Sequence, residues 1–264
     1  MADRSPLALW RGFLARPNDD RGKTIFVAML VAAVCSVFVT GATVVLRPIQ
    51  AANRAAETQL RLEALVSAIP GMRDLLATGG DLATVVVDLE TGMAARDVTP
   101  ETLDAALQDP ANYIALDPET DIAGIGARPR YVQVYIVRRE GRVETVIFPL
   151  IGAGYNGPLE AMIALSGDMN TIAGLTVTRQ SETPGLGARI EEEAWQSGWA
   201  GTEVRDPAGT MKFAVARGPS VSPYEVDGIT GASRTGRGVT QMVRFWLGDN
   251  GYGAVIDAIR RQEF

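Results

Sequence analysis

The sequence of 264 residues contains no histidine and a single cysteine, Cys35. Without an imidazole there is no Ser-His-Asp triad, and no zinc or haem site of the kinds that use histidine as a ligand. One thiol forms no internal disulfide and cannot by itself hold a cysteine-ligated iron–sulfur cluster. Redox chemistry in this chain would therefore have to be carried by an organic cofactor.

Positive charge is also scarce, since 25 Lys and Arg stand against 31 Asp and Glu and leave a formal net charge of −6. The first 23 residues are nevertheless basic, so the remainder carries the acidic excess. An acidic domain is a poor partner for nucleic acid, and we expect none. The acidic run Glu191-Glu192-Glu193 leaves carboxylate-based hydrolysis open, but the pattern favours the solvated first turn of a helix.

One long stretch lacks charge entirely, because residues 24–46 contain no Asp, Glu, Lys or Arg. At 1.5 Å per residue, about 23 helical residues cover the roughly 30 Å hydrocarbon core of a bilayer. We interpret the stretch as a single transmembrane helix. The alternatives are a buried core helix and a cleaved signal peptide, although the run is long for a signal peptide and has no clear cleavage site. More basic residues precede it than follow it, which predicts residues 1–23 in the cytoplasm and the large C-terminal part in a periplasm.

The chain after this stretch predicts an α+β fold with a mainly antiparallel sheet and flanking helices. Its first part, residues 47–128, is expected to contain a juxtamembrane helix over 51–69 and a β-branched strand over 83–89. A helix should follow with Thr99 as its cap and Pro100 at its first position. The polar segment that continues as far as Ile125 is expected to be irregular.

Residues 129–264 are predicted to form the second part, which is rich in strands. Hairpins are expected over 131–148, with Glu140-Gly141 as the turn, and over 159–178. A further strand is expected over 211–216. A helix should begin near Ser233, where apolar residues start to recur at helical spacing, and a short last helix should cover 252–261.

The most informative segment is the run Asp227-Gly228-Ile229-Thr230-Gly231-Ala232-Ser233-Arg234-Thr235. Its Gly and Ala residues let the backbone come close to a phosphate, and its small hydroxyl residues supply donors without crowding. Thr235 would be the acceptor hydroxyl, and a phosphate there would lie against the first N–H groups of the expected helix. The alternative from the residues alone is a turn in which Ser233 or Thr235 caps that helix.

This run resembles the acceptor pattern of proteins that carry FMN through a phosphoester bond to threonine, in which an aspartate precedes Ser/Thr-Gly-Ala-Ser/Thr-x-Thr. Residues 181–187 resemble the turn that holds the flavin ring in that family, and residues 152–159 resemble its glycine-rich strand. The resemblance implies covalent FMN on Thr235. It also implies a flavin-binding set of Glu182, Thr183, Leu186, Gly187, Asp227, Gly228, Thr230, Gly231, Ala232 and Ser233. Lys212, on an expected strand, is a further candidate neighbour of the flavin.

Three blocks outside the flavin region, residues 21–24, 46–50 and 245–249, are similar to the C subunits of the sodium-translocating NADH:quinone reductases. This resemblance implies an electron-relay subunit in a bacterial inner membrane. Its partners would be the other subunits of a complex that oxidises NADH, reduces quinone and exports sodium, and a flavin transferase would attach the FMN. Arg234 and Arg237 depart from the family pattern by adding charge. The alternatives are the G subunit of an Rnf-type electron-transport complex, and a membrane-tethered binding or regulatory protein with a noncovalent ligand.

Overall fold

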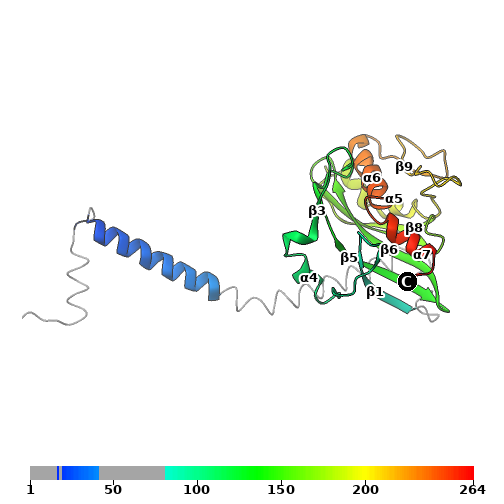
Figure 1. Ribbon diagram of the computed structural model, residues 1–264. Coiled ribbons are helices and arrows are strands. Elements are labelled where there is room, and N and C mark those ends of the chain that lie inside the picture. The colour runs from blue at the N-terminus through cyan, green and yellow to red at the C-terminus, as the bar shows by residue number, and fades with distance from the viewer. Residues whose placement is uncertain (1–16, 18–19, 42–80) are drawn as a thin grey trace, which may run out of the picture. The chain divides into compact units, whose positions relative to one another are not determined.

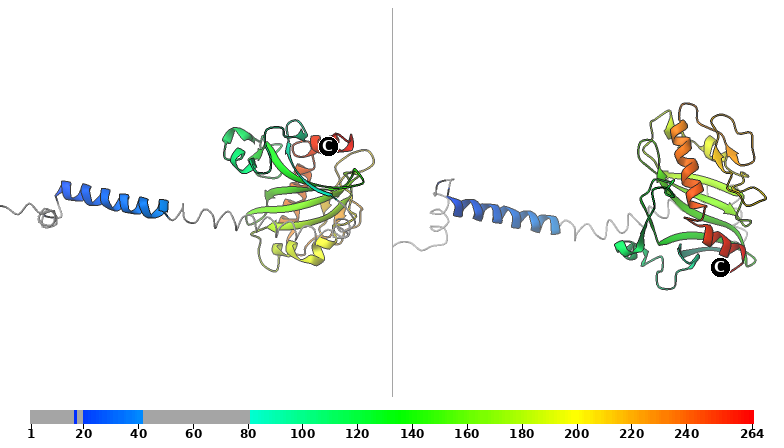
Figure 2. Two further views of the ribbon diagram at one scale, coloured as in Figure 1. Left: turned by 90° about the horizontal axis from the view of Figure 1, so that it is seen from below. Right: turned by 45° about the horizontal axis from the view of Figure 1, so that its top comes forward.

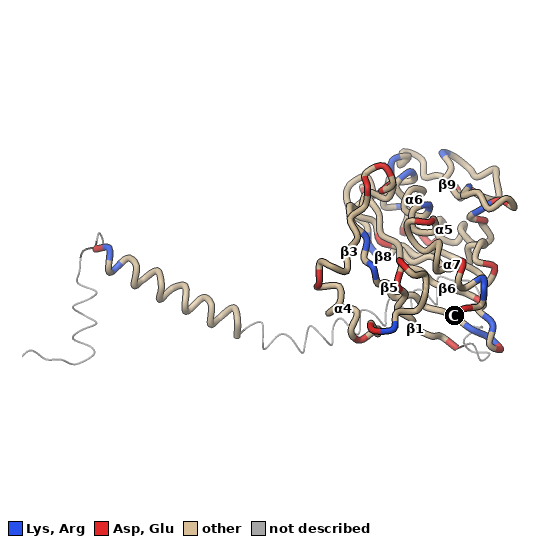
Figure 3. The backbone as a smooth tube through the Cα atoms, viewed as in Figure 1, with Lys and Arg blue, Asp and Glu red and all other residues tan. Residues whose placement is uncertain are grey.

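The computed structural model describes residues 17, 20–41 and 81–264 and divides into two compact units, residues 1–60 and 61–264. The described part of the first unit is one helix, Arg21–Gly41, whose most apolar 18-residue stretch has a mean hydropathy of 2.3 and whose side chains are mostly exposed. Asp20 caps it, since its Oδ1 accepts the backbone N–H of Gly22 at 2.7 Å. Charged residues lie only at the start of this helix (Figure 3). It is therefore long and apolar enough to cross a membrane. The expected helix over 51–69 and residues 42–46 lie outside the described residues.

The second unit is built on a six-stranded antiparallel sheet with the strand order β2-β1-β5-β6-β7-β8 (Figure 1). The strands are β1 (Asp81–Asp88), β2 (Met93–Ala94), β5 (Tyr131–Arg139), β6 (Arg142–Ala153), β7 (Pro158–Ser166) and β8 (Ile172–Arg179). The fold class is thus α+β, as predicted. Because β1 pairs with β5 along its whole length, the sheet continues across the boundary predicted between residues 128 and 129.

Turn chemistry explains the central hairpin. Glu140 and Gly141 connect β5 to β6 with φ angles of 52° and 77°, the two successive positive values of the tight turn that matches strand twist. The second predicted hairpin is also present, as β7 and β8. Alternate residues of β6 point to opposite faces of the sheet, so that Phe148 lies in the main core and Ile147 in a smaller cluster on the other face.

Two helices cover the main core face, α6 (Ser233–Trp246) and α7 (Gly253–Arg260) (Figure 2). Both are joined to β6 by polar atoms of buried aromatic residues. Trp246 donates its Nε1–H to the carbonyl of Ile151 at 2.6 Å, and the hydroxyl of Tyr252 donates to the carbonyl of Pro149 at 2.7 Å. The rings of Trp246 and Tyr252 are 5.2 Å apart. These contacts satisfy the polar atoms of large side chains and fix the position of α6 on the sheet.

Smaller elements differ from the sequence-based expectations. The segment expected to be irregular contains β3 (Tyr113–Ala115), which pairs with β4 (Ala127–Pro129), and a turn of 3₁₀ helix at Pro110–Asn112. The helix expected from Thr99 begins later, as α4 (Leu103–Ala106), with Thr102 at its N-cap position. The strand expected over 211–216 is reduced to β9 (Ala214–Val215), which pairs with β10 (Glu225–Val226). Short α5 (Glu193–Ser197) begins just after Glu192 and so includes the end of the acidic run.

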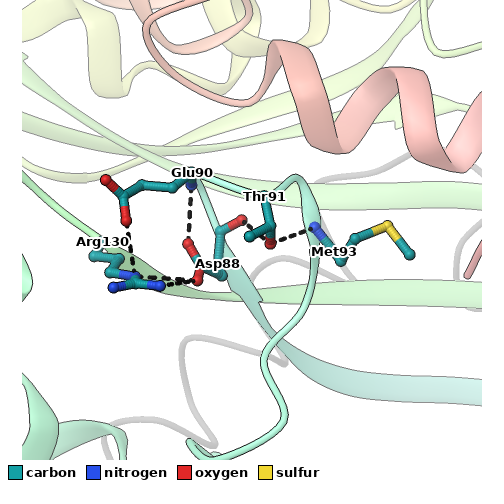
Figure 4. A network of polar contacts seen from close by, with 5 residues as sticks. All are labelled: Asp88, Glu90, Thr91, Met93 and Arg130. Carbon is teal, nitrogen blue, oxygen red and sulfur yellow. Dashed lines mark hydrogen bonds and ion pairs between the residues drawn. The ribbon is translucent and has the colours of Figure 1, made fainter.

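The end of β1 carries a charged network far in sequence from α6 (Figure 4). Asp88 is 6% exposed, and its Oδ2 accepts the Nε and Nη2 hydrogens of Arg130 at 3.0 and 2.7 Å. Its Oδ1 accepts the backbone N–H of Glu90 at 2.9 Å, and Glu90 also pairs with Arg130. Burial alone would raise the pKa of Asp88, but these hydrogen bonds and the charge of Arg130 lower it. The network stabilises the turn after β1.

Candidate functional site

Thr235 lies in the first turn of α6, where the chain leaves a loop that passes close to the sheet. Gly231 has a φ of 80°, a backbone conformation that favours glycine, and Ala232 is the N-cap residue. Neither Ser233 nor Thr235 caps this helix, so that alternative is wrong. Thr235 is instead 2% exposed and faces the protein interior. Gly238, one turn later, packs so closely that an added Cβ would lie 2.6 Å from the carbonyl oxygen of Ala153.

The turn over residues 181–187 follows β8 and supplies the partner of Thr235. Leu186 donates its backbone N–H to the carbonyl of Thr183 at 3.1 Å, and Gly185 between them has a φ of 75°. The turn leads into a 3₁₀ helix, Gly187–Glu191. It buries the side chain of Glu182, which is 5% exposed, while Leu186 remains 43% exposed.

The two segments meet at one hydrogen bond across the site. The hydroxyl of Thr235 donates to Oε2 of Glu182 at 2.7 Å, and both side chains are buried. The other carboxylate oxygen, Oε1, accepts the backbone N–H groups of Tyr155 at 2.6 Å and Asn156 at 3.1 Å. Asn156 also donates its side-chain amide to the hydroxyl of Thr183 at 2.9 Å. The turn between β6 and β7 thus holds the glutamate in place, so that one oxygen is left for Thr235.

Two glycines leave room for this pair. A Cβ on Gly187 would lie 2.5 Å from Oγ1 of Thr235 and 2.6 Å from Oε2 of Glu182. A Cβ on Gly154 would lie 2.3 Å from Oε1 of Glu182. Real Cβ atoms do not approach other heavy atoms so closely, so both positions require glycine while the pair keeps its geometry.

A cavity of about 320 Å³ opens beside Thr235, and we call it the threonine pocket. Its lining residues come from three segments of the chain: Tyr155, Glu182, Thr183, Leu186, Gly187, Gly231, Ala232, Ser233, Arg234 and Thr235. The guanidinium of Arg234 lies 5.1 Å from the centre of the Tyr155 ring, which places a positive charge at the pocket. The pocket therefore combines a buried hydroxyl, a helix N-terminus and a cation, which together suit a phosphate.

The first residues of the run 227–235, Asp227 to Thr230, line a different cavity. Its volume is about 360 Å³, and we call it the tryptophan pocket. Asp227, Gly228 and Thr230 lie there with Trp195, whose Nε1–H donates to the carbonyl of Asp227 at 2.8 Å. The carboxylate of Asp227 accepts the backbone N–H of Ser220 at 2.7 Å, and hydrogen bonds with Ser220 lower its pKa. The structure therefore separates these three predicted residues from the seven that line the threonine pocket with Thr235.

Lys212 lines neither pocket. Its ammonium group pairs with the carboxylate of Asp206 at 3.6 Å, and its carbonyl accepts a hydrogen bond from Arg244. The expected strand that placed it near the flavin is shortened to β9, which begins two residues later. The structure thus does not bring Lys212 to the site. In the described part of the chain, no group of three or more acidic or Cys side chains is arranged to hold a metal ion.

The sequence did not predict that the backbone of the turn after β6 would hydrogen-bond to Glu182. Tyr155 and Asn156 act through main-chain N–H groups, which any residue except proline could supply, so their side chains carry no signal. Gly152, Gly154 and Gly157 have the spacing G-x-G-x-x-G, a pattern found in dinucleotide-binding turns. In such folds it joins a strand to a helix, whereas here it joins the antiparallel strands β6 and β7. Gly154 instead makes space for Glu182, and Gly152 makes space for Met242 of α6.

Known proteins are similar to this chain over the segments that form the threonine pocket and beyond them. Residues 154–248 match the model of the FMN-binding domain family, which covers the turn after β6, the Glu182 turn and α6. The chain is 37% identical over 258 residues to the C subunit of the Na(+)-translocating NADH-quinone reductase of Pseudomonas aeruginosa, with 93% of this chain and 98% of the relative covered. The corresponding protein of Yersinia pestis is 35% identical, with 93% and 95% covered.

A solved structure shows the same fold. The crystal structure of Shewanella oneidensis NqrC superposes with a TM-score of 0.63 at 28% sequence identity, covering 72% of this chain and 88% of that chain. Both relatives are C subunits of this reductase, and each matches 93% of this chain at 35% identity or more, which favours the quinone reductase over the Rnf-type complex. The chain belongs to the family of C subunits of the Na(+)-translocating NADH-quinone reductase.

Proposed function

We propose that this chain is an FMN-carrying electron-transfer subunit of a sodium-translocating NADH:quinone reductase, with FMN joined to Thr235 by a phosphoester bond. The observation that carries the proposal is the buried Thr235 hydroxyl in the wall of the threonine pocket, inside the region that matches the FMN-binding family. A helix-capping threonine would accept a hydrogen bond from a backbone N–H of the first turn, whereas Thr235 donates to the carboxylate of Glu182.

The residues of the threonine pocket fit a flavin phosphate. The N-terminal N–H groups of α6 and the guanidinium of Arg234 favour an anion at Thr235. Gly187 and Gly231 line the pocket and carry no side chain that would fill it. Leu186 and Tyr155, which are 43% and 54% exposed, supply apolar surface at its edge for a flat ring. Bound there, FMN would supply reversible electron transfer.

Attachment would make the flavin a permanent carrier, and the chain's role is to hold it where partner subunits reach it. We propose that NADH and quinone react on other subunits, and that the complex couples this electron transfer to sodium export. Isolated protein should therefore carry FMN yet oxidise NADH negligibly. Rapid NADH oxidation by the isolated chain would contradict the relay role.

The membrane arrangement is part of the proposal. We place helix Arg21–Gly41 across a bacterial inner membrane, with the N-terminus in the cytoplasm and residues 81–264 in the periplasm. Protease added to intact spheroplasts should then remove the C-terminal domain, while a cytoplasmic marker protein survives. Protection of the domain until the membrane is broken would reverse the topology.

The test of attachment is a set of hydroxyl substitutions within one helix. Thr235→Ala should abolish flavin fluorescence of the denatured protein, whereas Ser233→Ala and Thr240→Ala should retain it. Thr240 is a matched control because its hydroxyl is already engaged, donating to the carbonyl of Gly236 and accepting the N–H of Val215. Fluorescence that persists in Thr235→Ala would move the attachment elsewhere. Flavin lost on denaturation of the wild type would favour a noncovalent ligand.

A further inference from the structure

We propose that Glu182 is the catalytic base of flavin attachment: it takes the proton from Thr235 as the threonine oxygen bonds to phosphorus. The inference rests on the proposed attachment at Thr235. It assigns part of the chemistry to the acceptor protein itself, in addition to the flavin transferase that supplies the flavin donor.

The geometry already has the donor and acceptor of that proton in contact. Oε2 of Glu182 lies 2.7 Å from Oγ1 of Thr235, within the range over which a general base acts. The two backbone N–H groups of Tyr155 and Asn156 engage Oε1, so the carboxylate is oriented with Oε2 toward the hydroxyl. Thr235 and Glu182 are 2% and 5% exposed, which keeps water from competing for this hydrogen bond.

Other groups of the pocket cannot take this role. Glu182 is the one carboxylate among the residues that line the threonine pocket, and the sequence contains no histidine. Arg234 has no acceptor atom and stays charged, and it suits the phosphate rather than the proton. A threonine hydroxyl is a weak nucleophile by itself, so a neighbouring base is needed at neutral pH.

The step balances as a phosphoryl-group transfer without redox change. The donor is a flavin phosphoanhydride, such as flavin adenine dinucleotide, which the transferase presents. The Thr235 Oγ1–H bond breaks and a bond from Oγ1 to the flavin phosphorus forms, while the anhydride P–O bond breaks and its electron pair leaves with the nucleoside monophosphate. The proton resides on Glu182 and is then passed to the leaving phosphate or to water.

The sharpest test is Glu182→Gln in the full-length chain, purified in detergent from cells that lack a flavin transferase. The two backbone N–H groups need an acceptor, so the glutamine oxygen should occupy the place of Oε1 and turn its NH₂ toward Thr235. The amide then donates to Oγ1 and cannot accept its proton. With purified transferase and flavin adenine dinucleotide, attachment measured by intact mass should slow by about 10²-fold or more. Glu160→Gln, which removes a carboxylate paired with Arg179 in the same sheet, should react like the wild type.

A second variant, Glu182→Asp, distinguishes a role of Glu182 as the base from a role in packing. Glu182→Asp keeps a carboxylate but shortens its reach, whereas Glu182→Gln keeps the shape but loses the base. A base predicts that the Asp variant attaches flavin faster than the Gln variant, and a packing role predicts the reverse order. Thermal melting should show both variants folded, and attachment to the Gln variant should recover as pH rises and hydroxide replaces the carboxylate.

The outcomes separate this inference from the proposed function. If the wild type gains flavin on Thr235 and the Gln variant gains it at the same rate, Glu182 is not the base and the attachment site stands. A Gln variant that reacts faster than the Asp variant would also overturn the inference. If the wild type gains no flavin on Thr235, both proposals fail.

Discussion

The threonine pocket and the tryptophan pocket lie beside one continuous run of sequence, yet they differ in what their polar groups do. In the threonine pocket, two buried side chains bond to each other across 53 positions of sequence, and the Thr235 hydroxyl is held against the Glu182 carboxylate. In the tryptophan pocket, Asp227 is exposed and bonds to a nearby loop. Burying polar groups costs free energy even when they bond to each other, so stability alone does not account for this pair. We therefore expect the two pockets to respond differently to substitution.

Among substitutions that leave both Thr235 and Glu182 in place, the largest effect should come from Gly187→Ala. The added methyl group would lie 2.5 Å from Oγ1 of Thr235 and 2.6 Å from Oε2 of Glu182, so the pair has to separate. Flavin attachment, measured by intact mass after incubation with transferase and donor, should fall at least tenfold, which is about 1.4 kcal/mol in the barrier.

The matched control lines the other pocket. Gly198→Ala would place its methyl group 3.4 Å from the carbonyl of Trp195, an ordinary contact, and should leave attachment unchanged. Equal loss in both glycine variants would mean that the two pockets act as one site.

A smaller effect on electron transfer is expected from Leu186→Asp. Leu186 is exposed at the edge of the threonine pocket, where a partner subunit would approach the flavin. The charge should slow quinone reduction by the assembled complex several-fold while the flavin stays attached. Val221→Asp changes an equally apolar side chain that is 91% exposed and lines neither pocket, and it should be silent. Unchanged quinone reduction by the Leu186 variant would place the docking surface elsewhere.

Trp195→Phe tests the tryptophan pocket and should have a modest effect on stability alone. It removes the exposed hydrogen bond from Nε1 to the carbonyl of Asp227, which should lower the free energy of unfolding by about 0.5–1.5 kcal/mol. Flavin attachment should remain within twofold of the wild type. A loss of attachment as large as that of Gly187→Ala would assign the flavin to this pocket as well.

Asp88→Asn lies far from both pockets in sequence. It should lower stability without changing flavin attachment, so it serves as a control for effects of stability alone. The loss of the charged bonds to Arg130 should cost about 1–2 kcal/mol of unfolding free energy, a value reduced because Arg130 is partly exposed. The folded-state pKa of Asp88 is lowered, so its contribution is present at neutral pH and is lost as pH falls below about 4 through that lowered value. Denaturation curves of the two proteins should converge in acid, and a constant difference would contradict this origin.

Local sequence patterns predicted most of the fold. The alternation of β5 and β6, the Glu140-Gly141 turn and the apolar face of α6 follow from periodicity and turn chemistry, and all are present. The β3 and β4 pair was missed, because each strand has only three residues and so shows too little alternation to be recognised. The pairing of β1 with β5 across the predicted boundary between residues 128 and 129 is a long-range contact, which local composition does not indicate.

The site was predictable in its parts and not in its arrangement. The family resemblance pointed to both Glu182 and Thr235, but no local rule places residues 53 apart within hydrogen-bond distance. Continuity in sequence also joined Asp227 to Thr235, whereas the positive φ of Gly231 turns the chain between the two pockets. Lys212 was predicted near the flavin because a strand was expected over residues 211–216. In the structure this strand is only Ala214–Val215, so Lys212 lies outside it.

The central claim is that Thr235 carries the flavin, and peptide mass mapping of protein purified from its native membrane tests it most directly. The account predicts that the peptide containing Thr235 is heavier by the mass of FMN less one water, with fragment ions that place the added mass on Thr235 itself. An unmodified Thr235 in protein that still holds flavin, whether on another residue or released by denaturation, would contradict it.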